Sequence, residues 1–307
     1  MYQSFFGLEQ QPFGLTPNTS LYYGLPPHEE AMEVLHTALV NGEGFIKVTG
    51  EVGTGKTMVL RLFISKLEEN YELVYIPNPT LNPLELKQSI AKELQLDVEN
   101  ISNLSLNDLI NNRLLDLNKS GKKVVMVVDE AQALSDETLE TVRLLGNLET
   151  EQDKMLQIVL FGQPELDLKL QQDNFRQLRQ RISFSYALRP LNEHETYSYL
   201  NYRMKASGFK GVEVFDSKVA RDIYVASYGI PRLINVIANK CLMLCYGFGV
   251  YAVTRKIVAE AIKDTNEVTK DWHHPRETSG FYLVISIITM ILATVGGCYL
   301  IILGSGA

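Results

Sequence analysis

The sequence is poor in cysteine, which cross-links small secreted domains, and it has fewer basic than acidic residues, unlike proteins that coat nucleic acids. It contains three cysteines in 307 residues, too few for a disulfide framework. Acidic residues outnumber basic ones, and the net charge of −7 argues against a general nucleic-acid coat protein without excluding a local basic patch. The N-terminus lacks both a basic segment and an apolar run, so we expect no secretory signal. The remaining composition is that of a globular protein with one large domain or two modest ones.

Two of the cysteines, Cys241 and Cys245, lie four positions apart on a helix predicted over 233–246. A metal site would need further cysteine or histidine ligands at suitable spacing, and no such residues are near in the sequence. We therefore expect two buried thiols that fill a hydrophobic core.

A long uncharged segment ends the chain. No charged residue occurs over 279–307, and the stretch 280–303 is almost wholly apolar. A run of about 23 such residues spans the hydrocarbon core of a bilayer. The bases Lys270 and Arg276 precede the span, so the charge bias predicts that the bulk of the protein stays in the cytoplasm. The sequence thus predicts a single-pass protein of the cytoplasmic (inner) membrane, with a juxtamembrane linker over 268–279.

The most informative motif is a glycine-rich loop of the pattern G-x-x-x-x-G-K-[ST], which follows the apolar run 45–49 and opens a predicted helix. It consists of Gly50, Glu51, Val52, Gly53, Thr54, Gly55, Lys56 and Thr57. In such loops, backbone N–H groups and the helix N-terminus bind phosphate oxygens. We expect Lys56 to reach the β- and γ-phosphates of ATP and Thr57 to hold Mg²⁺ through its hydroxyl group. A chance match is the alternative, and the strand before and the helix after argue against it.

Strands and helices alternate through the first part of the chain. The predicted strands cover 44–49, 72–76, 123–128 and 156–161, and the predicted helices cover 28–40, 56–69, 83–94, 106–119 and 136–148. The β-branched run at 123–128 is typical of a parallel sheet covered on both faces. After Phe184 the strands stop and the pattern becomes helical. We therefore predict an α/β fold with a parallel sheet flanked by helices, followed by a small all-helical lid domain.

The same patterns set the domain boundaries. The segment 1–27 is rich in aromatic residues, proline and glycine and is predicted to be irregular. The nucleotide-binding α/β domain is assigned to 28–190 and the helical lid domain to 191–267.

Two acidic residues, Asp129 and Glu130, close the buried strand at 123–128. In phosphate-loop proteins an acid at this point orders the Mg²⁺ shell, and a neighbouring carboxylate can take a proton from the attacking water. We assign Asp129 to magnesium and Glu130 to the general base. An acidic cap for the helix that starts near Ala131 is the alternative.

Further polar residues are candidates for phosphate chemistry. Gln163 follows the strand at 156–161 and so falls at the same sheet edge, where it would bind the γ-phosphate or the attacking water, unless it only forms a turn. Arg179 and Arg181 lie in a basic cluster that either supplies an arginine in trans to the transferring phosphoryl group or forms a solvated face. Arg232 starts a helix in the second domain, and it either closes onto the phosphates in cis or is a plain surface residue.

Several segments together resemble a known family. They are the phosphate loop, Asp129-Glu130-Ala131-Gln132, Gly162-Gln163-Pro164-Glu165-Leu166, Leu178-Arg179-Gln180-Arg181-Ile182, Gly229-Ile230-Pro231-Arg232, and the N-terminal Phe5-Phe6-Gly7-Leu8, Pro12-Phe13-Gly14-Leu15-Thr16-Pro17 and His28-Glu29-Glu30-Ala31. This combination is similar to the AAA+ ATPases of the ExeA/GspA type, and the likeness covers 1–267. Members like ExeA carry a further domain after the membrane helix, so we expect the shorter MshM-like type, which serves mannose-sensitive haemagglutinin (MSHA) pilus biogenesis.

The resemblance implies a Mg-ATP-dependent ATPase that works as a homo-oligomer, of the ring-forming kind, at the inner membrane. Its partners would be proteins that assemble a type IV pilus or a secretin-containing type II secretion machine. The resemblance also implies the sensor 1 position for Gln163, the sensor 2 position for Arg232, and the arginine finger for Arg179 or Arg181.

Other functions stay open from the sequence alone. A DNA-associated ATPase related to transposition regulators would share this core, but the predicted span and the acidic balance count against it, and we do not expect nucleic acid as a partner. A nucleotide-dependent interaction switch with little turnover is a second alternative, and Glu130 argues against it. A small-molecule kinase fits least, because no separate phosphate-acceptor domain is visible.

Overall fold

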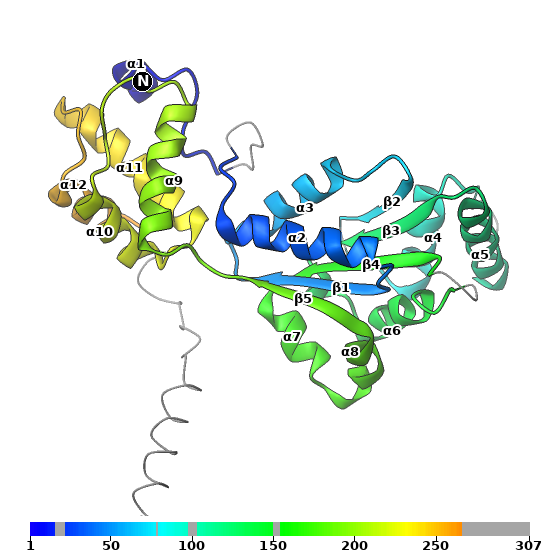
Figure 1. The fold of residues 1–307 in the computed structure, drawn as a ribbon. Helices are drawn as coiled ribbons and strands as arrows, with labels where there is room; N and C mark the ends of the chain where they lie inside the picture. Colours follow the sequence, from blue (N-terminus) through cyan, green and yellow to red (C-terminus); the bar gives the residue numbers. More distant parts are fainter. Residues whose placement is uncertain (16–21, 78, 98–102, 150–153, 266–307) are drawn as a thin grey trace, which may run out of the picture. The chain divides into compact units, whose positions relative to one another are not determined.

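The computed structural model describes residues 1–265 except 16–21, 78, 98–102 and 150–153 (Figure 1). By its internal contacts the chain divides into two units, Met1–Asn266 and Glu267–Ala307. The second unit, which includes the span predicted at 280–303, lies outside the described residues. Within the described part, no helix is both long enough and apolar enough to cross a membrane.

A five-stranded parallel sheet forms the α/β part of the molecule. Its strands are β1 (Phe45–Gly50), β2 (Tyr71–Ile76), β3 (Lys123–Val128), β4 (Leu156–Gly162) and β5 (Ile182–Leu188). They lie in the order β2-β3-β4-β1-β5, and each neighbouring pair is parallel. The inner strands β3, β4 and β1 are mostly buried, as expected of apolar strands covered on both faces. The predicted α/β fold with a parallel sheet is confirmed.

Helices cover both faces of this sheet (Figure 1). On one face lie α2 (Pro26–Val40) and α3 (Lys56–Ser65). On the other face lie α4 (Pro83–Glu93), α5 (Asn103–Lys119), α6 (Asp136–Leu145), α7 (Pro164–Leu170) and α8 (Arg176–Arg181). Alternate residues of β3 enter the two cores: Val125 and Val127 pack with α2 and α3, whereas Val124 and Met126 pack with the other group.

A group of helices follows the last strand. It consists of α9 (Glu193–Ala206), α10 (Ser217–Ser227), α11 (Pro231–Phe248) and α12 (Arg255–Lys263). Local signals start two of them: Asn192 and Glu195 form a capping box at α9, and the Asp216 side chain accepts from the Val219 N–H at α10. α10 packs against α9, α11 and α12, and α11 also packs against α12. We call this group the helical part.

Cys241 and Cys245 are free and buried on α11. Neither takes part in a cluster of three or more potential metal ligands, and no such cluster occurs among the described residues. The prediction of two core thiols is confirmed.

Two local predictions are wrong. Residues Tyr2–Phe6, predicted to be irregular, form the short helix α1, because Tyr2 and Phe6 are buried and the Tyr2 hydroxyl donates to Asn239 of α11. The strands were also predicted to stop by Phe184, whereas β5 continues to Leu188. β5 lies at the edge of the sheet and alternates exposed with half-buried residues, so it lacks the continuous apolar run of the inner strands.

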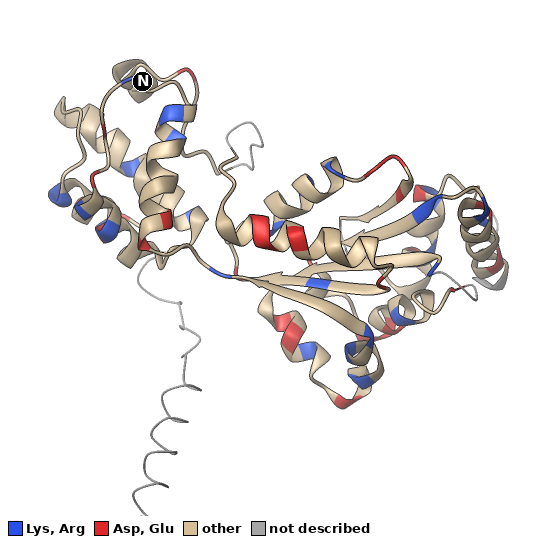
Figure 2. Ribbon diagram, viewed as in Figure 1, with Lys and Arg blue, Asp and Glu red and all other residues tan. Residues whose placement is uncertain are grey.

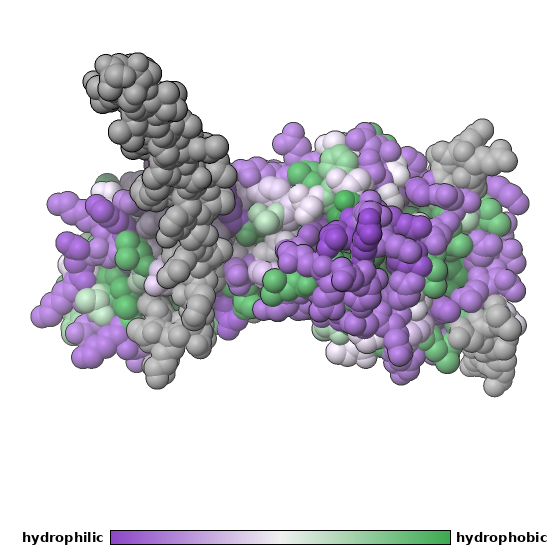
Figure 3. Space-filling model, turned by 90° about the horizontal axis from the view of Figure 1, so that it is seen from below, coloured by the Kyte–Doolittle hydropathy of each residue, from purple (hydrophilic) through white to green (hydrophobic). Residues whose placement is uncertain are grey.

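Charges of both signs are spread over the described surface. Figure 2 shows basic and acidic residues on both the α/β part and the helical part. Seen from below, the described surface is mostly hydrophilic, with smaller hydrophobic areas between (Figure 3). This mixed pattern agrees with the globular composition of the sequence.

We predict that Leu160→Ala lowers the free energy of unfolding by about 2–5 kcal/mol, because Leu160 is fully buried in β4 and its truncation leaves a cavity. Urea unfolding measures the change. Leu168→Ala is the matched control, since Leu168 on α7 is 64% exposed and its truncation should cost less than about 0.5 kcal/mol. Equal losses at both positions would contradict the assignment of β4 to the centre of the core.

Candidate active site

The carboxyl ends of three adjacent strands bring several predicted site residues together. β3, β4 and β1 are neighbours and run in the same direction. The phosphate loop follows β1, Asp129 and Glu130 follow β3, and Gln163 follows β4. They therefore emerge at one edge of the sheet, which is where parallel α/β sheets bind ligands.

The phosphate loop folds its lysine inward. Gly53 and Gly55 have φ of +85° and +104°, in the region that favours glycine. Lys56 is buried, and its Nζ donates to the carbonyls of Gly50 at 2.7 Å and Glu51 at 3.2 Å. Because α3 begins at Lys56, the N-terminus of this helix adds a partial positive charge to the loop.

Two contacts hold the loop from outside. The His28 side chain on α2 donates from Nε2 to the carbonyl of Thr54 at 2.9 Å, and a Cβ on Gly55 would lie 2.5 Å from the same nitrogen. Since the Thr54 carbonyl can only accept, Nε2 of His28 carries the proton. Burial lowers the pKa of His28, which keeps the imidazole neutral. The second contact comes from the helical part, where the backbone N–H of Arg232 donates to the carbonyl of Gly53 at 3.2 Å.

The end of β3 presents two carboxylates in different surroundings. Asp129 is buried, and its Oδ1 accepts from the backbone N–H of Glu130 at 2.9 Å. Glu130 has a left-handed backbone with φ of +49°, which is uncommon outside glycine and is concentrated at functional sites. Its Oε2 accepts from Nε2 of Gln163 at 3.1 Å. The structure thus joins the residue predicted as general base to the residue predicted at the sensor position.

The charged groups at this edge of the sheet shift one another's pKa. Burial raises the pKa of Asp129, and this effect outweighs the hydrogen bond from the backbone N–H of Glu130, which lowers it; the negative charge of Glu130 adds to the rise. Burial also acts to raise the pKa of Glu130, but hydrogen bonds from Gln132 and Gln163 and the charge of Lys56 outweigh it, so this pKa is lowered. Burial lowers the pKa of Lys56, and the two carboxylates oppose that change. Glu130 is therefore held as a carboxylate close to a buried ammonium group.

The donor set fits Mg²⁺. Ionised Asp129 is buried next to a second carboxylate, and a divalent cation would relieve this repulsion. Mg²⁺ is usually bound through one or two carboxylates together with phosphate and water ligands. The absence of a larger ligand cluster among the described residues is therefore compatible with Asp129 and Thr57 as the protein's contribution.

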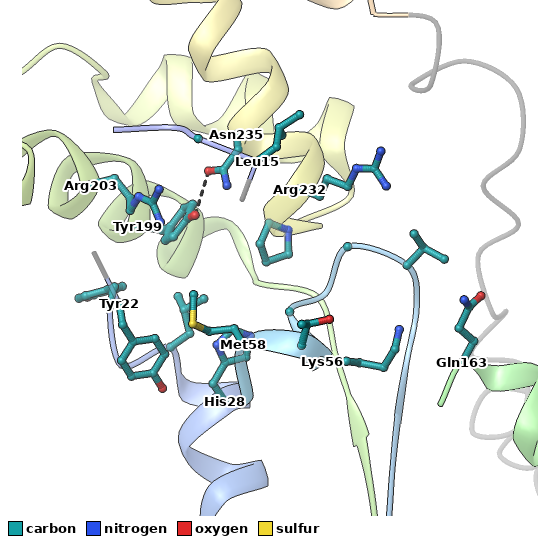
Figure 4. Close-up of a pocket in the computed structure, with 18 of the residues that line it drawn as sticks. Leu15, Tyr22, His28, Lys56, Met58, Gln163, Tyr199, Arg203, Arg232 and Asn235 are labelled. Atoms are coloured by element: carbon teal, nitrogen blue, oxygen red, sulfur yellow. Dashed lines mark hydrogen bonds between the residues drawn. The ribbon is translucent and has the colours of Figure 1, made fainter. Parts of the chain in front are cut away.

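A pocket of about 290 Å³ opens beside the loop (Figure 4). Predicted site residues line one end of it: Val52, Gly53, Gly55, Lys56, Thr57, Glu130, Gln163 and Arg232. The rest of its lining is largely apolar and aromatic: Gly14, Leu15, Tyr22, Tyr23, Leu25, His28, Met58, Tyr199, Arg203, Pro231 and Asn235. Four other predicted site residues are not part of this lining and contact residues of the site as described above: Gly50, Glu51, Thr54 and Asp129. A polar end joined to an apolar end suits the phosphates and base of a nucleotide.

The far end of the pocket was not identified from the sequence. The Tyr199 hydroxyl donates to Oδ1 of Asn235 at 2.8 Å (Figure 4). The guanidinium of Arg203 lies over the Tyr199 ring, and its Nε donates to the carbonyl of Pro12 at 2.6 Å. These residues come from three separate segments, so no single motif marks them. The i, i+4 spacing of Tyr199 and Arg203 on α9 is the one signal that could have paired them.

The structure does not bring Arg179 and Arg181 to this pocket. Both are exposed on α8, which leads into the first residues of β5. β5 runs parallel to β1, and the phosphate loop follows the other end of β1, so the two arginines lie at the opposite sheet edge. Arg179 donates to the carbonyl of Gln171 at 3.0 Å, and Arg181 donates to that of Arg143 at 3.3 Å.

Comparison with known proteins agrees with this geometry. Residues 40–170 match the family model AAA_22, described as an AAA domain. Solved structures with a similar fold include Cdc6p from Pyrobaculum aerophilum (20% identity, 81% of this chain and 70% of that chain, TM-score 0.60). The Aeropyrum pernix ORC2 protein in its ADPNP-ADP complexes is another (16% identity, 78% and 67%, TM-score 0.56). At these identities the structures show the fold alone. With the phosphate loop and its carboxylates, fold and family match define a P-loop ATPase of the AAA+ class.

Within that class the sequence is closer to one type. Over 269 residues the chain is 39% identical to the general secretion pathway protein A of Aeromonas hydrophila. The match covers 87% of this chain and 49% of that protein, so the chain spans about half the length of this relative. The chain is thus similar in sequence to the ExeA/GspA type over most of its length, as the motifs predicted. The narrower MshM-like assignment stays a prediction.

We predict that Gly53→Ala weakens ATP binding at least about tenfold, a change of about 1.4 kcal/mol. An added Cβ would lie 2.7 Å from Cβ of Arg232, so it would force the helical part away from the loop. Gly121→Ala is the matched control, because Gly121 also has a positive φ (+79°) but open space around it. Calorimetric titration with Mg-ATP measures both. Equal affinity in both variants would contradict a functional contact between Gly53 and Arg232.

Proposed function

We propose that this protein hydrolyses Mg-ATP as a homo-oligomer anchored in the inner membrane, in support of a type II secretion or type IV pilus assembly machine. The observation that carries the proposal is one pocket lined by Lys56 of the phosphate loop, by the linked pair Glu130 and Gln163, and by Arg232 of the helical part.

Each residue has a role that follows from its position. Lys56 now donates to two loop carbonyls, and it would turn these donors to phosphate oxygens when nucleotide binds. Thr57 and Asp129 would hold Mg²⁺, which supplies neutralisation of phosphate charge. The carboxylate of Glu130 accepts a proton from the attacking water, and the amide of Gln163 orients that water or a γ-phosphate oxygen. Arg232 adds positive charge in cis.

The oligomer supplies what a single chain lacks. Arg179 and Arg181 are exposed at the sheet edge opposite to their own pocket, so one of them would act as arginine finger only in a neighbouring subunit. An arginine supplied in trans typically raises turnover by about 10³-fold or more. Activity should therefore depend on assembly.

The proposed cellular role rests on the relative, and the proposed membrane attachment rests on the sequence. The Aeromonas protein is a general secretion pathway protein, which favours a secretion machine as client, and MSHA-type pilus assembly is the narrower alternative. The uncharged stretch 280–303 supports a single span. DNA association is an alternative that the assay below can detect, since one structure with this fold is Drosophila ORC bound to DNA (18% identity, TM-score 0.61).

We predict that the full chain hydrolyses ATP with a turnover per subunit that rises with protein concentration. Lys56→Ala should abolish ATP binding, and Glu130→Gln should retain binding while turnover falls about 10²–10⁴-fold. Lys66→Ala, at an exposed lysine after α3, is the matched control and should behave as wild type. Phosphate release with and without added DNA measures each case. Tight binding without hydrolysis at any concentration would favour the switch, and strong stimulation by DNA would favour the nucleic-acid alternative.

We predict that the full chain stays in the membrane fraction after alkaline carbonate washing, because about 20 apolar residues suffice for a span. A variant lacking 280–303 should be released, and replacing that stretch with an unrelated apolar segment of equal length should restore retention. Release of the full chain would remove the anchor from the proposal while leaving the ATPase proposal intact.

A further inference from the structure

We propose that Gln132 is a positioning residue that ties the general base Glu130 to the sensor residue Gln163, so that both act as one unit. This inference rests on the proposed ATPase function and adds a residue to its machinery. Gln132 neither lines the pocket nor was assigned a role from its motif.

Three hydrogen bonds close a ring among Gln132, Glu130 and Gln163, two between side chains and one from the Gln163 backbone. Nε2 of Gln132 donates to Oε2 of Glu130 at 2.6 Å, and Oε1 of Gln132 accepts from the backbone N–H of Gln163 at 3.0 Å. Nε2 of Gln163 donates to the same Oε2 of Glu130 at 3.1 Å, which completes the ring. The Gln132 amide thus bonds through its nitrogen to the general base and through its oxygen to the backbone of the sensor residue.

The backbone is shaped to make these bonds. Glu130 sits at φ +49°, and the short 3-10 turn Ala131–Ala133 follows it, with Ala131 buried in the core. On the partner strand, Gly162 leaves room for the amide: a Cβ there would lie 3.2 Å from Oε1 of Gln132 and 2.8 Å from Cδ2 of Leu166. The left-handed residue after β3 and the glycine that ends β4 together leave the space that Gln132 occupies.

The ring has a direct consequence for the general base. Two donors act on a single oxygen, Oε2, and so restrict the rotation of the Glu130 carboxylate at the lining of the pocket. Because the same Gln132 amide accepts from the Gln163 backbone, the position of the base is tied to that of the sensor residue. Without Gln132, only the bond from the Gln163 side chain would hold this oxygen.

The first test measures the hydrogen bond to the Gln163 backbone directly. Amide hydrogen exchange at Gln163 is followed by NMR in the full chain. Gln132→Ala should speed this exchange about fivefold or more, because it removes the acceptor Oε1 of that N–H. Gln88→Ala, at an exposed position on α4, is the matched control and should leave the rate unchanged. An unchanged Gln163 exchange rate in Gln132→Ala would overturn the proposal whether or not the protein hydrolyses ATP.

The second test separates positioning from binding. Gln132→Ala should lower kcat about 10–100-fold, the cost of misplacing a general base, while KM for ATP stays within about threefold. Loss of kcat and ATP binding together with a lowered Tm would show a structural role instead. If the wild-type chain does not hydrolyse ATP, the proposed function is contradicted. If wild type and Gln132→Ala hydrolyse ATP at the same rate, only this inference is contradicted.

Discussion

The hydrogen bond from the Arg232 amide to the Gly53 carbonyl joins the helical part of the molecule to the phosphate loop. It requires a glycine at position 53, because a side chain there would collide with Arg232, and it requires α11 to begin at Pro231 so that its first amides face the loop. With the His28 contact from the other side, the loop is held at two neighbouring carbonyls. A nucleotide bound here would touch both parts of the molecule, so nucleotide state and the placement of the helical part are physically linked.

Electrostatics at the sheet edge favour a phosphate and a cation as ligands of this site. A buried ammonium and two carboxylates lie close enough to shift one another's pKa, and burial opposes the charge on each of them. Such a group is stable only if opposite charges remain paired. Phosphates would satisfy Lys56 and the helix N-terminus, and Mg²⁺ would satisfy Asp129. The lowered pKa of Glu130 keeps its side chain ionised at neutral pH, which is the charge state that a general base needs before it accepts a proton.

Much of the α/β fold and of the phosphate end of the site could be predicted from the sequence. The loop from Gly50 to Thr57 and the buried run at 123–128 carry strong local signals, and strands that are parallel must place the residues after them at one edge. The edge strand β5 and the helix α1 gave weak signals, because their burial depends on partners distant in sequence. The same holds for His28, Tyr199 and Arg203, whose place at the pocket follows from packing between segments and not from spacing. The two arginines of α8 could be recognised as candidates, but only the topology shows that they face away from their own pocket.

Hydrogen exchange at the Arg232 amide tests the central claim most directly, since this N–H forms the link between the helical part and the loop. The exchange rate would be measured in the full chain with and without Mg²⁺ and a non-hydrolysable ATP analogue. The account predicts that the Arg232 amide and the amides of the phosphate loop become protected together when the analogue binds. Protection of the loop with unchanged or faster exchange at Arg232 would contradict a nucleotide site shared by the two parts.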